Sequence, residues 1–452
     1  GKSKFYGFDR GRMLLEREKQ LAILEQALAI VAEGRGQTVL ISGEAGIGKS
    51  SLTRAFLKAN GANARIVKGA CEDFSIAEPL APLYDLAREV GWDVPTGSFA
   101  EGERLSVFSQ ALSVLDDPKS PTIVLIEDLH WADDATIDLL RYIGRRIEDR
   151  KILMVLTSRD DEAGGRNNIR RAVASSPSGS VTRIVLDPLS KAAVTQLAQQ
   201  SGRDAKEVFA LTGGNAFFVT ELLDNVDGSQ SFTVKDAVLT RGEKVGEVAR
   251  KLLDVVSIFP RRAEVALVQA LHDFAMSDLE ACVNAGLLQA DQTYLSFRHE
   301  LARRAIEAEM AETRRQGLNK QLLAALIDRQ DSSNARLLHH AVAAGDRDAI
   351  NTFAPRAAYD ASSAGALKQT AAYLELALDN SPTQMTAERL DRMQRLAWVW
   401  YLIGDFHSAM KLQDQVLDQL VILGDIEAIG DCYRKLSRFH WGAGHGLSLI
   451  HI

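Results

Sequence analysis

One short stretch of the sequence, residues 42–50, has the residue types and the spacing that bind phosphate. It reads Ser-Gly-Glu-Ala-Gly-Ile-Gly-Lys-Ser and fits the phosphate-loop pattern Gly-x4-Gly-Lys-Ser/Thr. Its glycines let the backbone adopt positive φ angles and bring N–H groups close to a phosphate. Lys49 can reach the β- and γ-phosphates, and the Ser50 hydroxyl can ligate Mg²⁺. We therefore expect ATP or ADP, with Mg²⁺, as cofactors. The residues expected to bind the nucleotide here are Gly43, Gly46, Gly48, Lys49, Ser50 and Ser51.

The elements around this loop would position it for anion binding. Residues 38–41, Thr-Val-Leu-Ile, form an apolar, β-branched run that is typical of a buried strand. Residues 50–59 place apolar side chains on one helical face, and Gly61 is suited to end that helix. The positive end of the helix dipole would then point at the phosphate. A glycine-rich turn with a chance lysine would lack this context.

Two acids follow the apolar run at residues 123–126, Ile-Val-Leu-Ile, which predicts another strand. A carboxylate at the end of such a strand can hold Mg²⁺ or its water, and a second one can polarise the attacking water. We therefore predict that Glu127 and Asp128 are catalytic Walker B acids, and that Glu127 shares the Mg²⁺ with Ser50. The alternative is that the two acids cap the next helix. The order Glu–Asp reverses the common one, which leaves the division of roles open.

Arg159 follows a further predicted strand at residues 152–156. An arginine at a strand end can sense or stabilise a γ-phosphate, although a solvated charge is the alternative. Additional strands are expected at residues 64–68 and 183–186. Strands that alternate with helices predict a parallel sheet with helices on both faces, and ligands bind at the carboxyl ends of such strands.

The sequence after residue 186 is mostly helical. Residues 234–310 indicate three helices followed by a hairpin, with strands at 287–290 and 294–297 and a turn at Asp291-Gln292, which suggests a winged helix. From residue 311 onward, glycines separate helices of similar length at intervals of about 20 residues or twice that, which predicts helix-pair repeats of roughly 40 residues.

Composition excludes several classes of protein. A length of 452 residues predicts about three domains, and the net charge of −7 argues against a chain-wide nucleic-acid-binding surface. We found no apolar run of about 18 residues, so no membrane association is expected. The three cysteines have no metal-binding spacing, and they predict reduced thiols in a cytoplasmic protein.

Four segments resemble the signal-transduction ATPases with numerous domains (STAND ATPases), in particular the ATPase part of large bacterial LuxR-type transcription regulators of the MalT kind. They are the loop at 43–50, Val-Leu-Ile-Glu-Asp-Leu-His-Trp-Ala-Asp at 124–133, Gly-Gly-Asn-Ala-Phe-Phe-Val-Thr-Glu at 213–221, and Phe-Arg-His-Glu-Leu at 297–301. The resemblance extends from about Met13 to Gly446. The fold class expected is an α/β P-loop NTPase followed by a helical lid, a winged helix and an all-α solenoid of tetratricopeptide (TPR) type.

The domain boundaries expected on this basis divide the chain into six parts. They are a non-native leader at 1–12, the P-loop AAA/STAND ATPase domain at 13–186, the lid at 187–232, the winged helix at 233–310, incomplete TPR-like repeats at 311–446, and an adapter-derived tail at 447–452.

The resemblance also implies roles for individual residues. Arg159 would be the sensor arginine, and Gly214 and Asn215 would line the adenine side of the nucleotide. His299 would contact the β-phosphate from the winged helix and favour an ADP-bound off state, whereas its structural alternative is a helix-start or core histidine. The family's proline after the asparagine is replaced here by Ala216, which is a departure at the adenine contact.

The function implied is an ATP/ADP switch. An inducer or protein partner on the helical repeats would release the off state and promote homo-oligomerisation, and slow ATP hydrolysis would reset it. DNA would be reached only through a C-terminal domain outside this chain. Two alternatives stay open: an origin-recognition-type AAA+ ATPase that binds DNA through its winged helix, and a protein-binding scaffold in which nucleotide is structural.

Overall fold

The structure is a computed structural model that describes residues 15–74, 76–94, 103–159, 163–224, 234–260, 262–330 and 333–444. The expected leader at 1–12 and the expected tail at 447–452 lie outside these residues.

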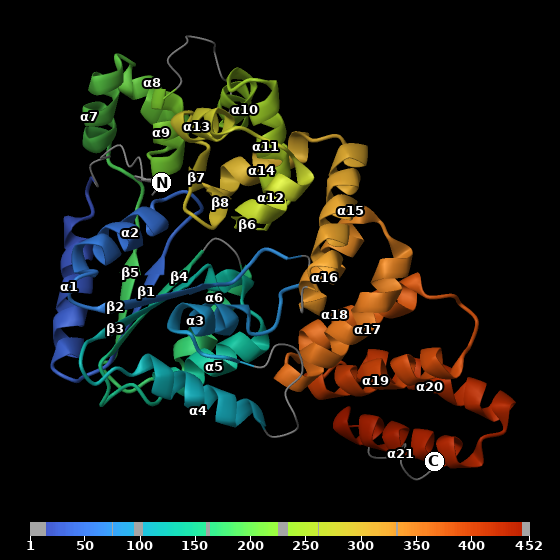
Figure 1. The fold of residues 1–452 in the computed structure, drawn as a ribbon. Helices are drawn as coiled ribbons and strands as arrows, with labels where there is room; N and C mark the ends of the chain where they lie inside the picture. Colours follow the sequence, from blue (N-terminus) through green and yellow to red (C-terminus); the bar gives the residue numbers. More distant parts are fainter. Residues whose placement is uncertain are drawn as a thin grey trace.

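A five-stranded parallel sheet forms the centre of the N-terminal part (Figure 1). Its strands are β1 (Gln37–Ser42), β2 (Arg65–Ala70), β3 (Thr122–Glu127), β4 (Ile152–Ser158) and β5 (Val181–Val185). Their order is β2-β3-β4-β1-β5, and every neighbouring pair is parallel. Two of the connections, from β1 to β2 and from β4 to β5, pass over intervening strands. The strands that carry the predicted motifs, β1, β3 and β4, therefore lie side by side.

Alternating apolar side chains attach helices to both faces of this sheet. In β1, Val39 and Ile41 pack with α1 (Glu18–Ala32) and α2 (Lys49–Asn60). Leu40, between them, points to the other face and packs in the core that α3 (Ala81–Val90), α4 (Glu103–Leu115) and α5 (Asp134–Gly144) share. The period of two places successive residues on opposite faces. The predicted α/β fold with helices on both faces is therefore confirmed.

Two groups of elements follow the sheet, both above it in Figure 1. The first contains α7 (Lys191–Ser201), α8 (Ala205–Thr212) and α9 (Ala216–Asp224). The second contains α10 (Val234–Lys244), α11 (Glu247–Ser257), α12 (Val265–Leu271), α13 (Met276–Asn284) and α14 (Glu300–Glu309). It also holds an antiparallel sheet of order β6-β8-β7, made of β6 (Ala263–Glu264), β7 (Leu288–Ala290) and β8 (Tyr294–Phe297). The hairpin lies where the sequence predicted it.

The C-terminal part is a row of antiparallel helices in which each helix packs against the next. They are α15 (Glu312–Asp328), α16 (Asn334–Ala344), α17 (Arg347–Ala364), α18 (Leu367–Asn380), α19 (Ala387–Ile403), α20 (Phe406–Leu423) and α21 (Ile426–Gly442). Gly345, Gly365, Gly404 and Gly424 each end a helix in the left-handed conformation, as C-terminal glycines commonly do. The predicted helical array is confirmed, and no helix among the described residues is both long and apolar enough to cross a membrane.

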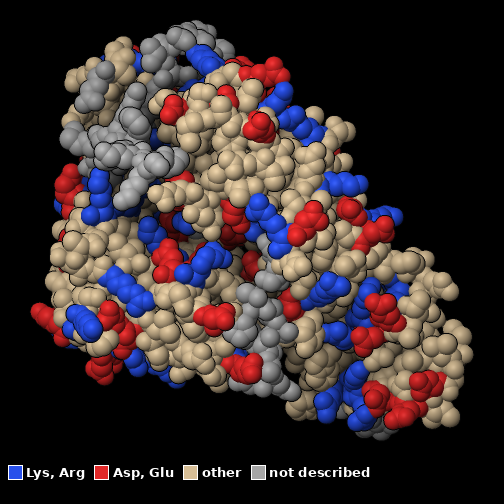
Figure 2. All heavy atoms as spheres, in the orientation of Figure 1, with Lys and Arg blue, Asp and Glu red and all other residues tan. Residues whose placement is uncertain are grey.

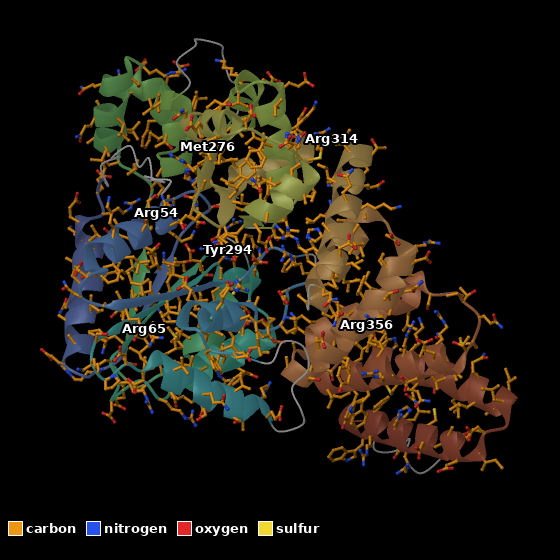
Figure 3. The ribbon with its side chains drawn as sticks, viewed as in Figure 1. Arg54, Arg65, Met276, Tyr294, Arg314 and Arg356 are labelled. Carbon is orange, nitrogen blue, oxygen red and sulfur yellow. The ribbon has the colours of Figure 1, made fainter. Side chains whose placement is uncertain are left out.

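Polar contacts connect these parts to one another. Arg314 of α15 donates through Nε to Asp254 of α11 at 2.9 Å (Figure 3). Arg104 of α4 donates to the carbonyl oxygen of Ala364, at the end of α17, at 3.2 Å, which connects the helical array to the part of the chain that contains the parallel sheet. Acidic and basic side chains are interspersed over the face shown in Figure 2. The described residues of that face therefore form no single-sign stripe of the kind that tracks a nucleic-acid backbone.

Candidate functional site

The predicted phosphate loop joins β1 to α2 and has the backbone that its glycines allow. Gly46 and Gly48 have φ angles of +77° and +107°, and Gly48 stands at the N-cap of α2. Lys49 is buried, and its Nζ donates to the carbonyl oxygens of Gly43 at 2.6 Å and Glu44 at 2.8 Å. The ammonium therefore lies across the loop itself, where it can balance a phosphate charge. Ser50 and Ser51 are exposed in the first turn of α2.

The two predicted acids lie at the end of β3. This strand pairs with β4, and β4 pairs with β1, the strand that leads into the phosphate loop. Glu127 is the last residue of β3, and Asp128 follows it with a left-handed φ of +58°. The backbone N–H of Asp128 donates to Oγ1 of Thr157 at 3.1 Å. Because β3 pairs with β4 and β4 pairs with β1, these acids and the phosphate loop share the carboxyl edge of the sheet.

Arg159 comes directly after β4 and is buried beside the same edge. Ser158, the residue before it, pairs with Ser42 at the start of the phosphate loop. The guanidinium carbon of Arg159 lies 5.1 Å from the centre of the Trp131 ring, and that of Arg304 lies 5.6 Å from the same ring. Arg304 belongs to α14, so the indole that follows β3 contacts two arginines from different parts of the chain.

Arg304 is fixed by acids as well as by the indole. It forms ion pairs with Asp73, which follows β2, and with Glu300 of its own helix. Burial alone would lower the pKa of Arg304, but Asp73 and Glu300 outweigh it and raise that pKa. The guanidinium therefore stays charged close to the nucleotide edge. Sequence reasoning missed Asp73 and Arg304 because no short motif connects them.

His130 lies between Asp128 and Trp131 and is 8% exposed. Neither ring nitrogen has a hydrogen-bond partner among the described residues, although the ring packs on Trp131 at 4.4 Å between centroids. Burial, with the charges of Arg159, Lys49 and Arg304, lowers the pKa of His130 to about 3. The imidazole is therefore neutral at ordinary pH, with one N–H able to donate. The sequence signal was the Leu-His-Trp stretch after the acids, which carried no assigned role.

The segment at 213–217 closes over the phosphate loop from above. The side-chain amide of Asn215 donates to the carbonyl oxygen of Ala45 at 2.9 Å, and the backbone N–H of Phe217 donates to that of Gly46 at 2.9 Å. A Cβ on Gly46 would stand 2.8 Å from Cβ of Phe217. Gly214 approaches the backbone of Leu189 instead, because a Cβ there would lie 2.2 Å from its carbonyl oxygen. The need for glycine at position 214 is therefore explained by this packing.

His299 contacts the segment at 213–217 from α14. It is the N-cap residue of α14, and its ring lies 4.5 Å from that of Phe217 between centroids. The predicted site residues thus come together around one edge of the sheet. They are the residues of the loop, the two acids, Arg159, Asn215 and His299. Their individual roles stay predictions.

The residues present fit a nucleotide with Mg²⁺. A glycine loop too tight at Gly46 to admit a Cβ, a buried lysine and a helix N-terminus supply donors for phosphate oxygens. Ser50 and Glu127 supply the oxygen ligands that Mg²⁺ prefers. When bound, the ion would neutralise phosphate charge, and Lys49 and Arg159 would share that task.

The part of the chain that contains the phosphate loop and the two acids is similar to known ATPase domains. Residues 13–156 match the family model of the AAA ATPase domain, so the N-terminal part of the chain is an AAA-type ATPase domain. An uncharacterized protein of Rhizobium meliloti is 25% identical over 88% of this chain. The chain spans 46% of that relative's length.

Solved structures resemble the chain at the level of the fold. A STAND protein with a tetratricopeptide repeat sensor from Pyrococcus horikoshii superposes with a TM-score of 0.50 at 15% identity, over 92% of this chain and 67% of its own. A Cdc6p from Pyrobaculum aerophilum gives a TM-score of 0.40 at 15% identity, over 72% of this chain and 97% of its own. The first of these supports the arrangement of an ATPase fold followed by a helical array.

Proposed function

We propose that this chain is a nucleotide-dependent switch built on an AAA ATPase domain. Lys49, Ser50 and Glu127 would hold the phosphates and Mg²⁺ of ATP or ADP. Residues 187–232 would act as a lid and residues 233–310 as a winged helix, closing over the phosphate loop in an ADP-bound off state. The helical array from residue 311 would receive an inducer or a protein partner.

One observation carries this proposal: the phosphate loop is touched from outside the ATPase domain. Asn215 and Phe217 donate hydrogen bonds to loop carbonyls, and His299 packs on Phe217. A change in the loop when the nucleotide changes would therefore alter contacts with two other parts of the chain. Coupling of a ligand to different arrangements of the same parts is what a switch requires.

The finer reading is a regulatory ATPase of LuxR type. Activation would bring homo-oligomerisation, slow hydrolysis would return the chain to its off state, and DNA would be bound by a domain outside this chain. The four sequence segments that resemble STAND regulators support it, and so does the STAND protein from Pyrococcus horikoshii, whose repeats are described as a sensor.

The test is to extract and identify the nucleotide that copurifies with the chain. ADP near one per chain is expected in the parent protein, absent from Lys49→Ala and unchanged in Lys58→Ala, which removes an exposed lysine of the same helix. An empty site with fast ATP turnover, together with DNA binding that weakens as salt rises, would contradict the switch and favour a DNA-binding AAA+ machine. Partner binding that survives Lys49→Ala unchanged would favour the scaffold.

A further inference from the structure

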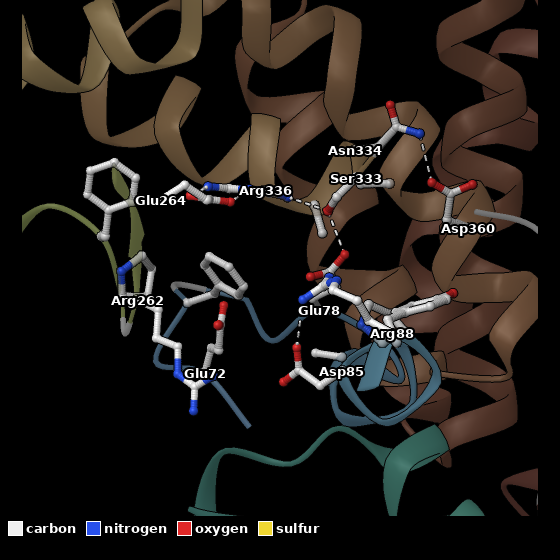
Figure 4. Close-up of a pocket in the computed structure, with 18 of the residues that line it drawn as sticks. Glu72, Glu78, Asp85, Arg88, Arg262, Glu264, Ser333, Asn334, Arg336 and Asp360 are labelled. Carbon is white, nitrogen blue, oxygen red and sulfur yellow. Dashed lines mark hydrogen bonds and ion pairs between the residues drawn. The ribbon is translucent and has the colours of Figure 1, made fainter. Parts of the chain in front are cut away.

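A cavity of about 460 Å³ lies where three parts of the chain meet (Figure 4). Its walls come from α3 and the segment before it, from the end of α11 with β6 and β8, and from α16 and α17. The volume is in the range of small-molecule sites. Neither the phosphate loop nor Glu127 and Asp128 are among the lining residues. The cavity is therefore separate from the nucleotide site.

Charged side chains line the cavity, and among the described lining residues carboxylates outnumber guanidiniums. The carboxylates are Glu72, Glu78, Asp85, Glu264 and Asp360, and the guanidiniums are Arg88, Arg262 and Arg336. Arg336 already places its terminal nitrogens 2.9 and 2.8 Å from the two oxygens of Glu264, and Arg88 lies 3.3 Å from Asp85. The lining therefore has an excess of negative charge, which favours a cationic ligand over an anion.

The carboxylates are spread along the cavity instead of converging on one point. Figure 4 shows Glu72 and Asp360 on opposite sides of the view, with Glu78 between them. No group of three potential metal-binding side chains is arranged around a common centre in the described part of the chain. Spaced carboxylates of this kind suit a ligand with several separated positive charges better than they suit a metal ion.

Asp360 and Glu78 are held in place by neighbouring polar groups. Asn334 donates through Nδ2 to Asp360 at 2.7 Å, and the Ser333 hydroxyl donates to Glu78 at 2.5 Å. Burial raises the pKa of Asp360, which means that its charged form lacks solvation. An ammonium group in the cavity would offset that loss.

Aromatic rings also line the cavity. They belong to Phe74, Tyr84, Phe259 and Tyr294. Ring faces and edges accept methylene chains by apolar contact, and they attract ammonium groups through the ring quadrupole. The lining therefore offers separate places for the charged and the apolar portions of one linear molecule.

We propose that this cavity binds a linear aliphatic polyamine, with its ammonium groups on Glu78 and Asp360 and its methylene chain along the rings. Because three parts of the chain supply the walls, an occupied cavity would favour one arrangement of those parts. Nucleotide affinity and polyamine affinity would then be coupled reciprocally. The coupling rests on the proposed switch, whereas the binding itself does not.

The binding test is calorimetric titration of spermidine into the full chain carrying Lys49→Ala, so that spermidine cannot bind through the phosphates of a nucleotide. Saturable binding is expected. Glu78→Gln, which keeps an acceptor for the Ser333 hydroxyl, and Asp360→Asn should each weaken it about tenfold, the usual size of a lost charge contact. Asp379→Asn removes an exposed carboxylate of α18 and should leave binding unchanged.

Three results would overturn the site: no saturation up to ~1 mM spermidine, equal affinity in Glu78→Gln and the parent, or equal competition by Mg²⁺. Circular dichroism of each variant separates lost folding from lost binding. In the parent chain, spermidine should change the equilibrium affinity for ADP about fivefold or more, which is the lower end of the usual coupling between two sites. Binding without this change would overturn the coupling alone, and loss of ADP binding with intact spermidine binding would overturn only the proposed switch.

Discussion

The imidazole of His299 and the phenyl ring of Phe217 lie 4.5 Å apart between centroids, with their planes inclined by 53°. Phe217 also donates its backbone N–H to Gly46 in the phosphate loop. α14 and α9 therefore meet directly above the loop, and His299 is connected to it through one residue.

Replacing His299 with alanine should speed the release of bound ADP. The ring pair contributes about 0.5–1.5 kcal/mol, which corresponds to a release rate roughly two- to tenfold higher if the contact is made only in the closed state. Release of a fluorescent ADP analogue measures the change. His407→Ala, at an exposed position on α20, serves as the control. An unchanged rate in His299→Ala would mean that the ring pair does not hold the closed state.

Gly46→Ala should abolish nucleotide binding and destabilise the protein. The new Cβ would meet Cβ of Phe217 at 2.8 Å and Oδ1 of Asn215 at 2.9 Å, and the φ of +77° is unfavourable for alanine. Gly202→Ala is the matched control, because Gly202 has a similar φ of +71° and nothing within 4 Å of the added Cβ. The control should show only the backbone cost of about 1–2 kcal/mol. Equal losses in both variants, measured by urea unfolding, would argue against close packing of residues 215–217 on the loop.

Local patterns predicted the elements because they are local in origin. The apolar run at 123–126 became β3, which extends one residue further at each end. The turn between β7 and β8 was predicted from Asp291, and its Oδ1 accepts from the N–H groups of Thr293 and Tyr294 at 2.8 and 2.7 Å. A side chain that satisfies backbone groups two and three residues ahead leaves a signal in the sequence.

Contacts between distant parts left no such signal. Trp131 holds Arg304, and Asp73 pairs with the same arginine, although the three residues come from separate elements. Which arginine of α14 meets the indole depends on how the second group of helices docks on the sheet. The residues of the phosphate edge, Arg159 included, could therefore be named from the sequence, whereas the contacts of Arg304 with Trp131 and Asp73 could not.

The last acid of the Leu-His-Trp-Ala-Asp stretch has a structural explanation. Asp133 is the N-cap of α5, where Oδ1 accepts from the Thr136 N–H at 3.0 Å, and Oδ2 accepts from the Leu80 N–H at 3.1 Å. It therefore joins the start of α5 to the start of α3. One short stretch of sequence can thus combine residues at the nucleotide edge with one that fixes the helix behind them.

Glu221→Gln should be strongly destabilising. Glu221 of α9 forms an ion pair with Arg241 of α10, and both side chains are almost fully buried. Arg241 also donates to the carbonyl oxygen of Ala285 at 3.1 Å. Removing one charge leaves the other buried and uncompensated, at a cost of about 3–5 kcal/mol in the free energy of unfolding.

The exposed pair of Glu312 and Arg315 provides the comparison for Glu221. Glu312→Gln should cost less than about 1 kcal/mol, because water already screens that pair. The double change Glu221→Gln with Arg241→Met should recover part of the loss, since no unpaired charge is then left in the core. Similar costs for the two single variants in urea unfolding would show that the buried pair is solvated.

The stability of the fold should fall with acid below pH 6.5, and His340 should cause part of that fall. His340 is fully buried, its Nδ1 lies 2.8 Å from Oδ1 of Asn319, and burial lowers its pKa well below the ordinary value of 6.5. The unfolded chain therefore binds a proton that the folded chain does not, so stability is fully present above pH 6.5 and is lost as the pH falls toward the folded pKa. Each such histidine contributes a slope of up to ~1.4 kcal/mol per pH unit.

His340→Asn keeps a donor for Asn319 but cannot titrate, so its unfolding free energy should be lower at neutral pH yet should depend less steeply on pH between 6.5 and 5. Urea unfolding of both proteins across that interval measures the slopes, and parallel slopes would mean that His340 is protonated in the folded state.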